Sequence, residues 1–415
     1  MQVLIQQAKI TDKRSGFYNQ VVDVLIEKGV ITQIAKSIKL KAKNIIKADG
    51  LCVSTGWVDV LADYREPGYE HKETIESGLK AAAAGGFTHV CIAPNTNPAI
   101  STKSIVQSVM QKAAGNIVSL HPLGAITQDI EGKNLAEMLD MYAHGAIAFT
   151  DGWKPVQNPQ LMLKALEYVK AFDGTLIQIP VDNALAAGGL MHEGETSVRL
   201  GMPGIPALSE TILLYRDIEL LRYTGSKLHV TGVSTTEGVD MIRKAKKEGL
   251  NITCSVTPYH LVLNDKALEG YSSMYKVMPP IRSEADRKAL LKGLKDGTID
   301  CIASHHRPQE WDAKAKEFEY AADGMNIQEI AYNLALQAAG DERIADMMTA
   351  ARDILGLGDT NIEVGAVADL TIYTTAGTWT LNEMQSKSAN NPFIGTTVQG
   401  KVIGIINNKQ VHLNK

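Results

Sequence analysis

Short apolar runs alternate with amphipathic stretches through the middle of the chain. Segments such as ETIESGLKAAAAGG and TEGVDMIRKAKKEG space their apolar residues three or four apart, as in a helix with one face on a core. Between such segments lie eight apolar runs: GWVDVLAD, THVCIAP, IVSLHPLGAIT, GAIAFTD, TLIQIPV, KLHVTGV, NITCSVTP and TIDCIASHH. This alternation predicts parallel β-strands connected by helices.

Eight such units within about 300 residues favour a closed barrel over an open doubly wound sheet. No G-x-G-x-x-G motif follows an early run, which disfavours a dinucleotide-binding fold. The predicted fold class is therefore α/β, with a (β/α)8 TIM barrel over residues 56–361.

The two ends of the chain have a different pattern. MQVLIQQAKI and VVDVLIEKGVITQIA near the start, and VADLTIYTT and GKVIGIINNKQVHL near the end, are strand-like runs separated by turn residues. Neither end contains a long helical period. We therefore expect residues 1–55 and 362–415 to form one small, sandwich-like β domain.

The composition excludes some classes of binding partner but identifies none. A net charge of −4 gives no basic surface for nucleic acid, and no apolar stretch is long enough to span a bilayer. The start of the chain lacks the pattern of a signal peptide. Each of the four cysteines lies in an apolar run without paired metal-binding spacing, as expected of small buried residues. The sequence predicts a cytoplasmic protein that binds neither nucleic acid nor membrane.

Polar residues gather where the predicted strands end, which is where barrel enzymes carry their chemistry. These residues are Asp63, Arg65, Asn95, Asp151, Asp182, Ser234, His305 and His306. They would form a ring of mixed charge and chemistry at one end of the barrel.

Several long motifs resemble the bacterial dihydroorotases of the amidohydrolase superfamily. The first is GWVDVLADYREPGYEHKETIESGLKAAAAGGFTHVCIAPNTNP, and later ones include LMHEGETSVRLGMPGIPALSE, LHVTGVSTTEGVDMIRKAKKEGL, KVMPPIRSEADR and SKSANNPFIG. The resemblance covers nearly the whole chain. It implies an amidohydrolase-type barrel with a small β domain, and a dihydroorotase-like cyclic amidohydrolase of pyrimidine biosynthesis.

The resemblance also locates the family's metal ligands, and this sequence departs from them. The H-x-H pair after the first strand falls on Leu61 and Asp63, and the histidines after the fifth and sixth strands fall on Ile179 and Gly232. The aspartate that acts as general base in the family is replaced by His305. Since leucine, isoleucine and glycine side chains cannot coordinate a metal, we do not expect the family's binuclear centre.

The remaining polar residues either bind a single metal ion or only form hydrogen bonds. The family's shared carboxylate or modified lysine matches Asp151, whose neighbour Gly152 stands where the family has a second aspartate. Asp63, Asp151 and His305 would be the ligands of a rebuilt single-metal site, with zinc as cofactor, in an active cyclic amidase. The other reading, which we favour, is that these are hydrogen-bonded strand-end residues without a metal, and that the protein is non-catalytic.

A ligand site is a third possibility, because Arg65 and Asn95 match the positions that bind the substrate carboxylate in the family. A guanidinium beside an amide suits a carboxylate, so the protein would be a sensor of a carboxylated pyrimidine. The structural alternative is that Arg65 pairs with Glu66 or Glu70 while Asn95 holds a turn in PNTNP. Two other substrate positions have changed, to Met278 and Gln309, and the loop at 324–330 has also changed.

The resemblance extends to partners. Related inactive members act as structural partners of aspartate transcarbamoylase, and family members commonly form homo-oligomers. Both are expected here only on that resemblance. The glycine-rich segment 186–206 is either a connection over the pocket or a lid and docking loop.

Overall fold

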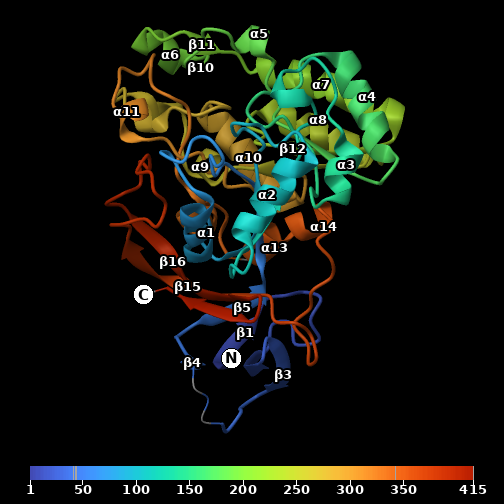
Figure 1. Cartoon of the computed structure of the whole chain (residues 1–415). Coiled ribbons are helices and arrows are strands. Elements are labelled where there is room, and N and C mark those ends of the chain that lie inside the picture. The colour runs from blue at the N-terminus through green and yellow to red at the C-terminus, as the bar shows by residue number, and fades with distance from the viewer. Residues whose placement is uncertain (41, 43, 342, 415) are drawn as a thin grey trace.

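Parallel strands form the wall of a barrel in the middle of the chain (Figure 1). The computed structural model describes residues 1–40, 42, 44–341 and 343–414. Two parallel groups of strands make up the wall. The first is β6 (Trp57–Ala62), β7 (Phe87–Ile92) and β8 (Ser119–Pro122). The second is β9 (Thr175–Gln178), β12 (Lys227–Thr231), β13 (Ile252–Val256) and β14 (Cys301–Ile302).

Isolated bridges join the two groups into a ring. Phe149 bridges to both Gly124 and Leu176, and Ala62 bridges to His306. The predicted strand GAIAFTD is thus reduced to contacts around one residue. The reason lies two residues further on, where the Asp151 carboxylate accepts the backbone N–H groups of Ile126 and Thr127. All eight predicted strand positions nevertheless contribute to the ring.

Helices connect these strands, and both helices quoted from the sequence are present. They are α1 (Ile75–Ala84), capped by the Thr74 hydroxyl, and α8 (Thr236–Lys247), capped by the Thr235 hydroxyl. Such caps satisfy N–H groups that lack a partner within the helix. The other helices of the barrel region are α2 (Lys103–Ala113), α3 (Met138–Ala143), α4 (Pro159–Lys170), α7 (Leu208–Thr224), α9 (Pro258–Val262), α10 (Glu284–Asp296), α11 (Trp311–Lys314), α12 (Ala331–Ala339), α13 (Ile344–Thr349) and α14 (Ala351–Ile354).

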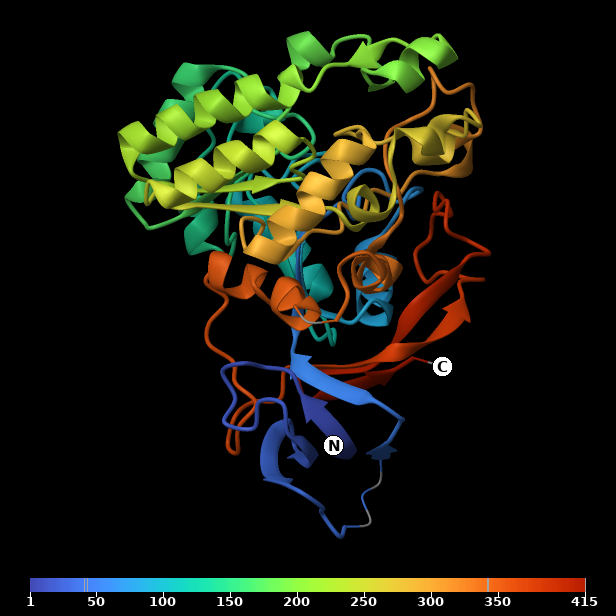
Figure 2. The same ribbon diagram turned by 180° about the vertical axis from the view of Figure 1, so that it is seen from behind.

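Both ends of the chain contribute to one eight-stranded sheet below the barrel (Figures 1 and 2). Its strands are β1 (Gln2–Ile10), β2 (Val21–Glu27), β3 (Val30–Ala35), β4 (Asn44–Ile46), β5 (Leu51–Thr55), β15 (Leu370–Thr380), β16 (Thr397–Asn407) and β17 (Gln410–Leu413). The two ends meet where β15 pairs antiparallel with β5. The boundaries of a separate domain, 1–55 with 362–415, stay a prediction.

The arrangement sets the orientation of the barrel. Because β6 starts directly after β5, the amino ends of the parallel strands face the sheet and their carboxyl ends face away from it. At that far end Figure 1 shows α5 (Asn183–Ala186), β10 (Met191–His192), α6 (Glu195–Leu200) and β11 (Gly204–Ile205). Within the described ranges, no helix has the length and apolarity needed to cross a membrane.

Candidate functional site

Six residues occupy the positions that the resemblance assigns to the metal ligands and the general base, and we call them the ligand positions: Leu61, Asp63, Asp151, Ile179, Gly232 and His305. Leu61 and Ile179 are buried in an apolar cluster that fills this part of the barrel. Zinc takes nitrogen, oxygen or sulfur ligands, and three of the six side chains have none. These side chains therefore do not fit a zinc ion held as in the family.

Asp63, which directly follows β6, is fully buried and its carboxylate is already used. One oxygen accepts the Arg65 backbone N–H at 3.2 Å. The other accepts the indole N–H of Trp153 at 2.8 Å and lies 3.1 Å from Arg65 Nη1. A buried carboxylate with a cation and two donors is satisfied without a metal.

His305 lies in the barrel interior, where its Nε2 hydrogen-bonds to the Thr231 hydroxyl at 2.8 Å while its buried Nδ1 has no partner among the described residues. Burial lowers its pKa to about 3, so the ring is neutral at pH 7. Its ring meets that of Trp153 edge-on, with 5.2 Å between centroids. A Cβ atom at Gly232 would lie 2.6 Å from His305 Cε1, so a histidine at 232 would require His305 to move.

Asp151 is directed to the backbone that follows β8. Its carboxylate accepts N–H groups of Ile126 and Thr127, each at 2.9 Å, and the Thr127 hydroxyl. Burial raises its pKa to about 6, although the hydrogen bonds from Thr127 oppose that rise. Gly152 next to it has φ +55°, and a Cβ there would lie 1.9 Å from Asn95 Oδ1. A second aspartate in the family's manner would not fit at this position.

The predicted single-metal set is not brought together. In the described part of the chain, no three His, Cys, Asp or Glu side chains are grouped as metal ligands would be. Asp63 and His305 instead both contact Trp153, whereas Asp151 is bonded to the segment after β8.

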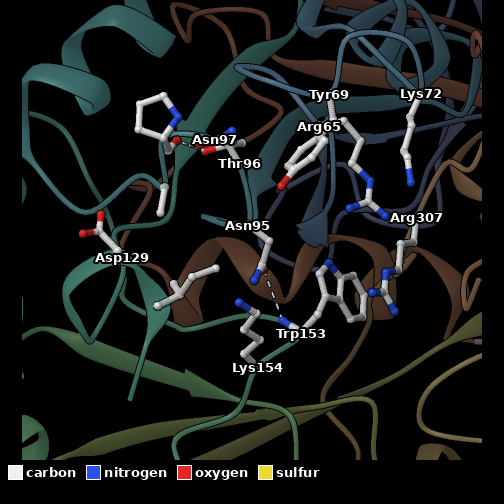
Figure 3. Close-up of a pocket in the computed structure, with 13 residues that line it drawn as sticks. Arg65, Tyr69, Lys72, Asn95, Thr96, Asn97, Asp129, Trp153, Lys154 and Arg307 are labelled. Carbon is white, nitrogen blue, oxygen red and sulfur yellow. Dashed lines mark hydrogen bonds between the residues drawn. The ribbon is translucent and has the colours of Figure 1, made fainter. Parts of the chain in front are cut away.

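A pocket of about 550 Å³ opens beside the ligand positions (Figure 3). We call it the cationic pocket, because four of its lining residues are basic. Its lining comprises Arg65, Tyr69, Lys72, Asn95, Thr96, Asn97, Pro98, Ala99, Asp129, Ile130, Trp153, Lys154 and Arg307. Arg65 and Asn95, both predicted from the sequence, therefore line one pocket.

Asn95 differs from its predicted role. Its amide donates to the Asp151 carbonyl at 3.1 Å, and its side-chain oxygen accepts the Trp153 backbone N–H at 3.1 Å. It thus ties together the turn after Phe149, and these bonds are not within its own PNTNP segment, where the structural alternative had placed them. Arg65 pairs with Asp63 through Nη1 and with neither Glu66 nor Glu70 among the described ion pairs.

Sequence reasoning missed two residues that shape the site, Trp153 and Arg307. The Arg307 guanidinium lies over the Trp153 ring, 4.7 Å from its centroid, in a cation–π contact. Together they form the wall between the cationic pocket and a second cavity of about 280 Å³ lined by apolar residues such as Ile179, Val181 and Met278. The sequence did offer a signal for both residues. Trp153 in FTDGW and Arg307 in SHHR each follow the end of a predicted strand, where barrel enzymes carry their chemistry.

Comparison with known proteins places the chain among cyclic amidohydrolases. A family model described as dihydro-orotase-like matches residues 50–238. The chain is 38% identical over 414 residues to a protein named dihydroorotase from Syntrophus aciditrophicus, covering 97% of each. It is 39% identical over 411 residues to one from Ruminiclostridium cellulolyticum, covering 97% of this chain and 96% of that protein.

Solved structures support the fold. An L-hydantoinase (dihydropyrimidinase) from Arthrobacter aurescens aligns over the whole chain and 96% of its own, with a TM-score of 0.84 at 21% identity. At that identity the likeness speaks only for the fold, and it confirms the predicted α/β barrel with an adjoining β-sheet. The full-length matches to dihydroorotases confirm the family resemblance. The chain belongs to the dihydroorotase family.

Proposed function

We propose that this dihydroorotase-like cyclic amidohydrolase homologue is non-catalytic, and that it acts in pyrimidine biosynthesis as a structural or regulatory partner of another enzyme. The observation that carries the proposal is the position of Trp153. Its indole N–H occupies an Asp63 oxygen while its ring packs on His305. Two of the three ligand positions that retain donor atoms thus contact one aromatic side chain, and the third, Asp151, is hydrogen-bonded to Ile126 and Thr127.

The chemistry of the family explains why this matters. Opening a cyclic amide takes an activated water and a polarised carbonyl, both of which a metal ion supplies when it is bound. In this chain Leu61, Ile179 and Gly232 offer no ligand atom. His305, at the general-base position, shares its Nε2 with Thr231. None of these groups supports the generation of a hydroxide.

Metal content and turnover, measured on one preparation purified without chelators, test this proposal. We expect well below one metal ion per chain, and no interconversion of dihydroorotate and carbamoyl aspartate with zinc supplied. An active dihydroorotase purified the same way is the control. Zinc near one per chain together with turnover would overturn the proposal and favour the rebuilt single-metal enzyme.

The proposed partner is aspartate transcarbamoylase, on the strength of the family resemblance alone. Light scattering coupled to gel filtration, with each protein alone and both mixed at micromolar concentration, tests it. We expect a homo-oligomer of this chain and a larger species in the mixture. An unchanged mass in the mixture would remove this partner.

A second candidate function is a sensor of a carboxylated pyrimidine. The observation that favours it is the cationic pocket, in which Arg65 faces a volume suited to a small molecule. A ligand that binds the folded state raises its melting temperature. Thermal shift with dihydroorotate, orotate and carbamoyl aspartate is the test, and no shift with any of them would exclude this candidate.

A further inference from the structure

Arg65 has more hydrogen-bond donors than the protein satisfies. The residue is only 8% exposed. Its Nη1 pairs with Asp63, but its Nε and Nη2 are buried and have no hydrogen-bond partner among the described residues. Buried donors are rarely left unpaired, since each costs free energy unless something accepts its hydrogen bond.

Arg307 is in a similar state in the same pocket. Its Nε is buried without a partner, and within the described ranges its guanidinium makes no ion pair closer than 4 Å. The Trp153 ring supports it in a cation–π contact, and the carboxylates of Asp323 and Asp63 favour its charged form. The backbone is firmly held, because Arg307 N–H donates to the Met325 carbonyl at 2.8 Å and the Asn390 amide donates to the Arg307 carbonyl at 3.1 Å.

The two guanidinium groups act on one another. Figure 3 shows both on the same side of the cationic pocket, with Asp129 on the opposite side. Burial lowers the pKa of Arg307, and the charge of Arg65 lowers it further. Like charges held close together in a partly buried site are unfavourable unless an anion lies between them.

We propose that Arg65 and Arg307 together form a metal-independent binding site for an oxyanion, a carboxylate or phosphoryl group of a small molecule. Each planar guanidinium presents a fork of donors that matches two oxygens of such a group. Arg307 takes the place that Asn95 was expected to hold, because the Asn95 amide is bonded to backbone. Lys154 lies exposed at the rim, where it adds positive charge.

This inference deepens the sensor candidate by naming its recognition group, and it does not depend on the protein being non-catalytic. Isothermal titration calorimetry with inorganic phosphate and with acetate, at constant ionic strength and with a chelator present, tests it. We expect saturable binding with a Kd below about 1 mM for at least one of the two. Phosphate binding alone would identify a phosphorylated ligand, and acetate binding alone a carboxylated one.

Variants then locate the anion. Arg307→Gln and Arg65→Gln should each weaken binding about tenfold or more, as expected for a lost charge-assisted hydrogen bond. If both arginines hold one anion, the double variant should be less than about twofold weaker than the poorer single variant. Arg222→Gln, at an exposed arginine paired with Glu219 and Glu248, is the matched control and should bind normally. Circular dichroism melts verify that each variant is folded.

The outcomes separate the two claims. Absence of binding by both anions at 10 mM, or normal binding by folded Arg307→Gln, would overturn this site. Two binding events per chain, of which each variant loses only one, would also overturn it, since they mean two separate anions. None of these results bears on metal content or turnover, which decide the proposed non-catalytic role.

Discussion

The ligand positions and the cationic pocket lie at the same end of the barrel, yet their charged groups differ in how many partners the protein provides. At the ligand positions Leu61 and Ile179 are packed in the core, and Asp63 has its partners within the protein. In the cationic pocket, Arg65 and Arg307 keep buried donors without a partner among the residues that the structure describes.

The difference shows where a ligand or ion from outside the protein would still gain hydrogen bonds. The satisfied carboxylate of Asp63 gains little from a metal ion or a ligand, whereas the buried Nδ1 of His305 has no hydrogen-bond partner among the described residues. A region with unpaired donors gains a hydrogen bond from every acceptor that enters it. Trp153 is the boundary between the two, because it donates to Asp63 and carries Arg307 on its ring.

The largest effect is expected when a metal-binding side chain is returned to the ligand positions. In Leu61→His an imidazole replaces a fully buried leucine in an apolar cluster. We expect the free energy of unfolding to fall by about 2–4 kcal/mol, measured by urea denaturation. Leu61→Met, which conserves volume, should cost less than about 1.5 kcal/mol. Restoration of stability by added zinc would show that the metal site persists.

Asp63→Asn acts on both regions at once. It leaves the Arg65 guanidinium buried without its counterion, so we expect a loss of about 2 kcal/mol in urea denaturation. The same change frees Arg65 Nη1, and phosphate or acetate should bind several-fold more tightly by calorimetry. Asp140→Asn, at a surface ion pair with Lys103, is the control for a lost carboxylate. A weaker affinity in Asp63→Asn would contradict the division between the regions.

His305, one of the ligand positions, makes the stability of the protein sensitive to acid. Its folded pKa of about 3 lies below the value of about 6.5 expected in the unfolded chain. Between these pH values the unfolded chain binds more protons than the folded protein does. The contribution of neutral His305 to stability is therefore complete above pH 6.5 and is lost as the pH falls toward 3. In His305→Asn the loss between pH 6 and pH 5 should be smaller by about 1 kcal/mol. Asparagine tolerates the φ of +47° at this position. Equal pH slopes in urea titrations would mean that His305 is not the acid-sensitive group.

The smallest effect is expected at Lys72, which also lines the cationic pocket. Unlike Arg307, its ammonium already donates to Gln309 Oε1 at 2.8 Å and lies 3.3 Å from a Glu310 oxygen. Lys72→Gln should therefore weaken anion binding less than about threefold, with a change in stability under about 0.5 kcal/mol. A loss as large as that of Arg307→Gln would place the anion at Lys72 instead.

Much of the fold was predictable because its signal is local. Apolar periodicity located the helices α1 and α8 and the strand positions of the barrel, and the terminal runs predicted the sheet strands. The fourth strand was overestimated, since the hydrogen bonds of the Asp151 side chain are not visible in a hydrophobic pattern.

The site was predictable only in part. Which ligand positions lack donor atoms follows directly from residue identity, as for Leu61 and Gly232. The contact between Trp153 and Arg307 joins residues that follow the fourth and the eighth strand, so it depends on side-chain packing across the barrel. Likewise, Asn95 is occupied by backbone groups that only the folded turn brings near it.

The pairing of β5 with β15 has a consequence for how the protein is made. About 300 residues separate the two strands, and a ribosome adds roughly 5–20 residues per second. For some 15–60 s the edge of β5 is therefore without its final neighbour, and its free N–H and C=O groups are open to other strands. Nascent chains stalled before Leu370 should accordingly be the aggregation-prone and chaperone-bound species during synthesis.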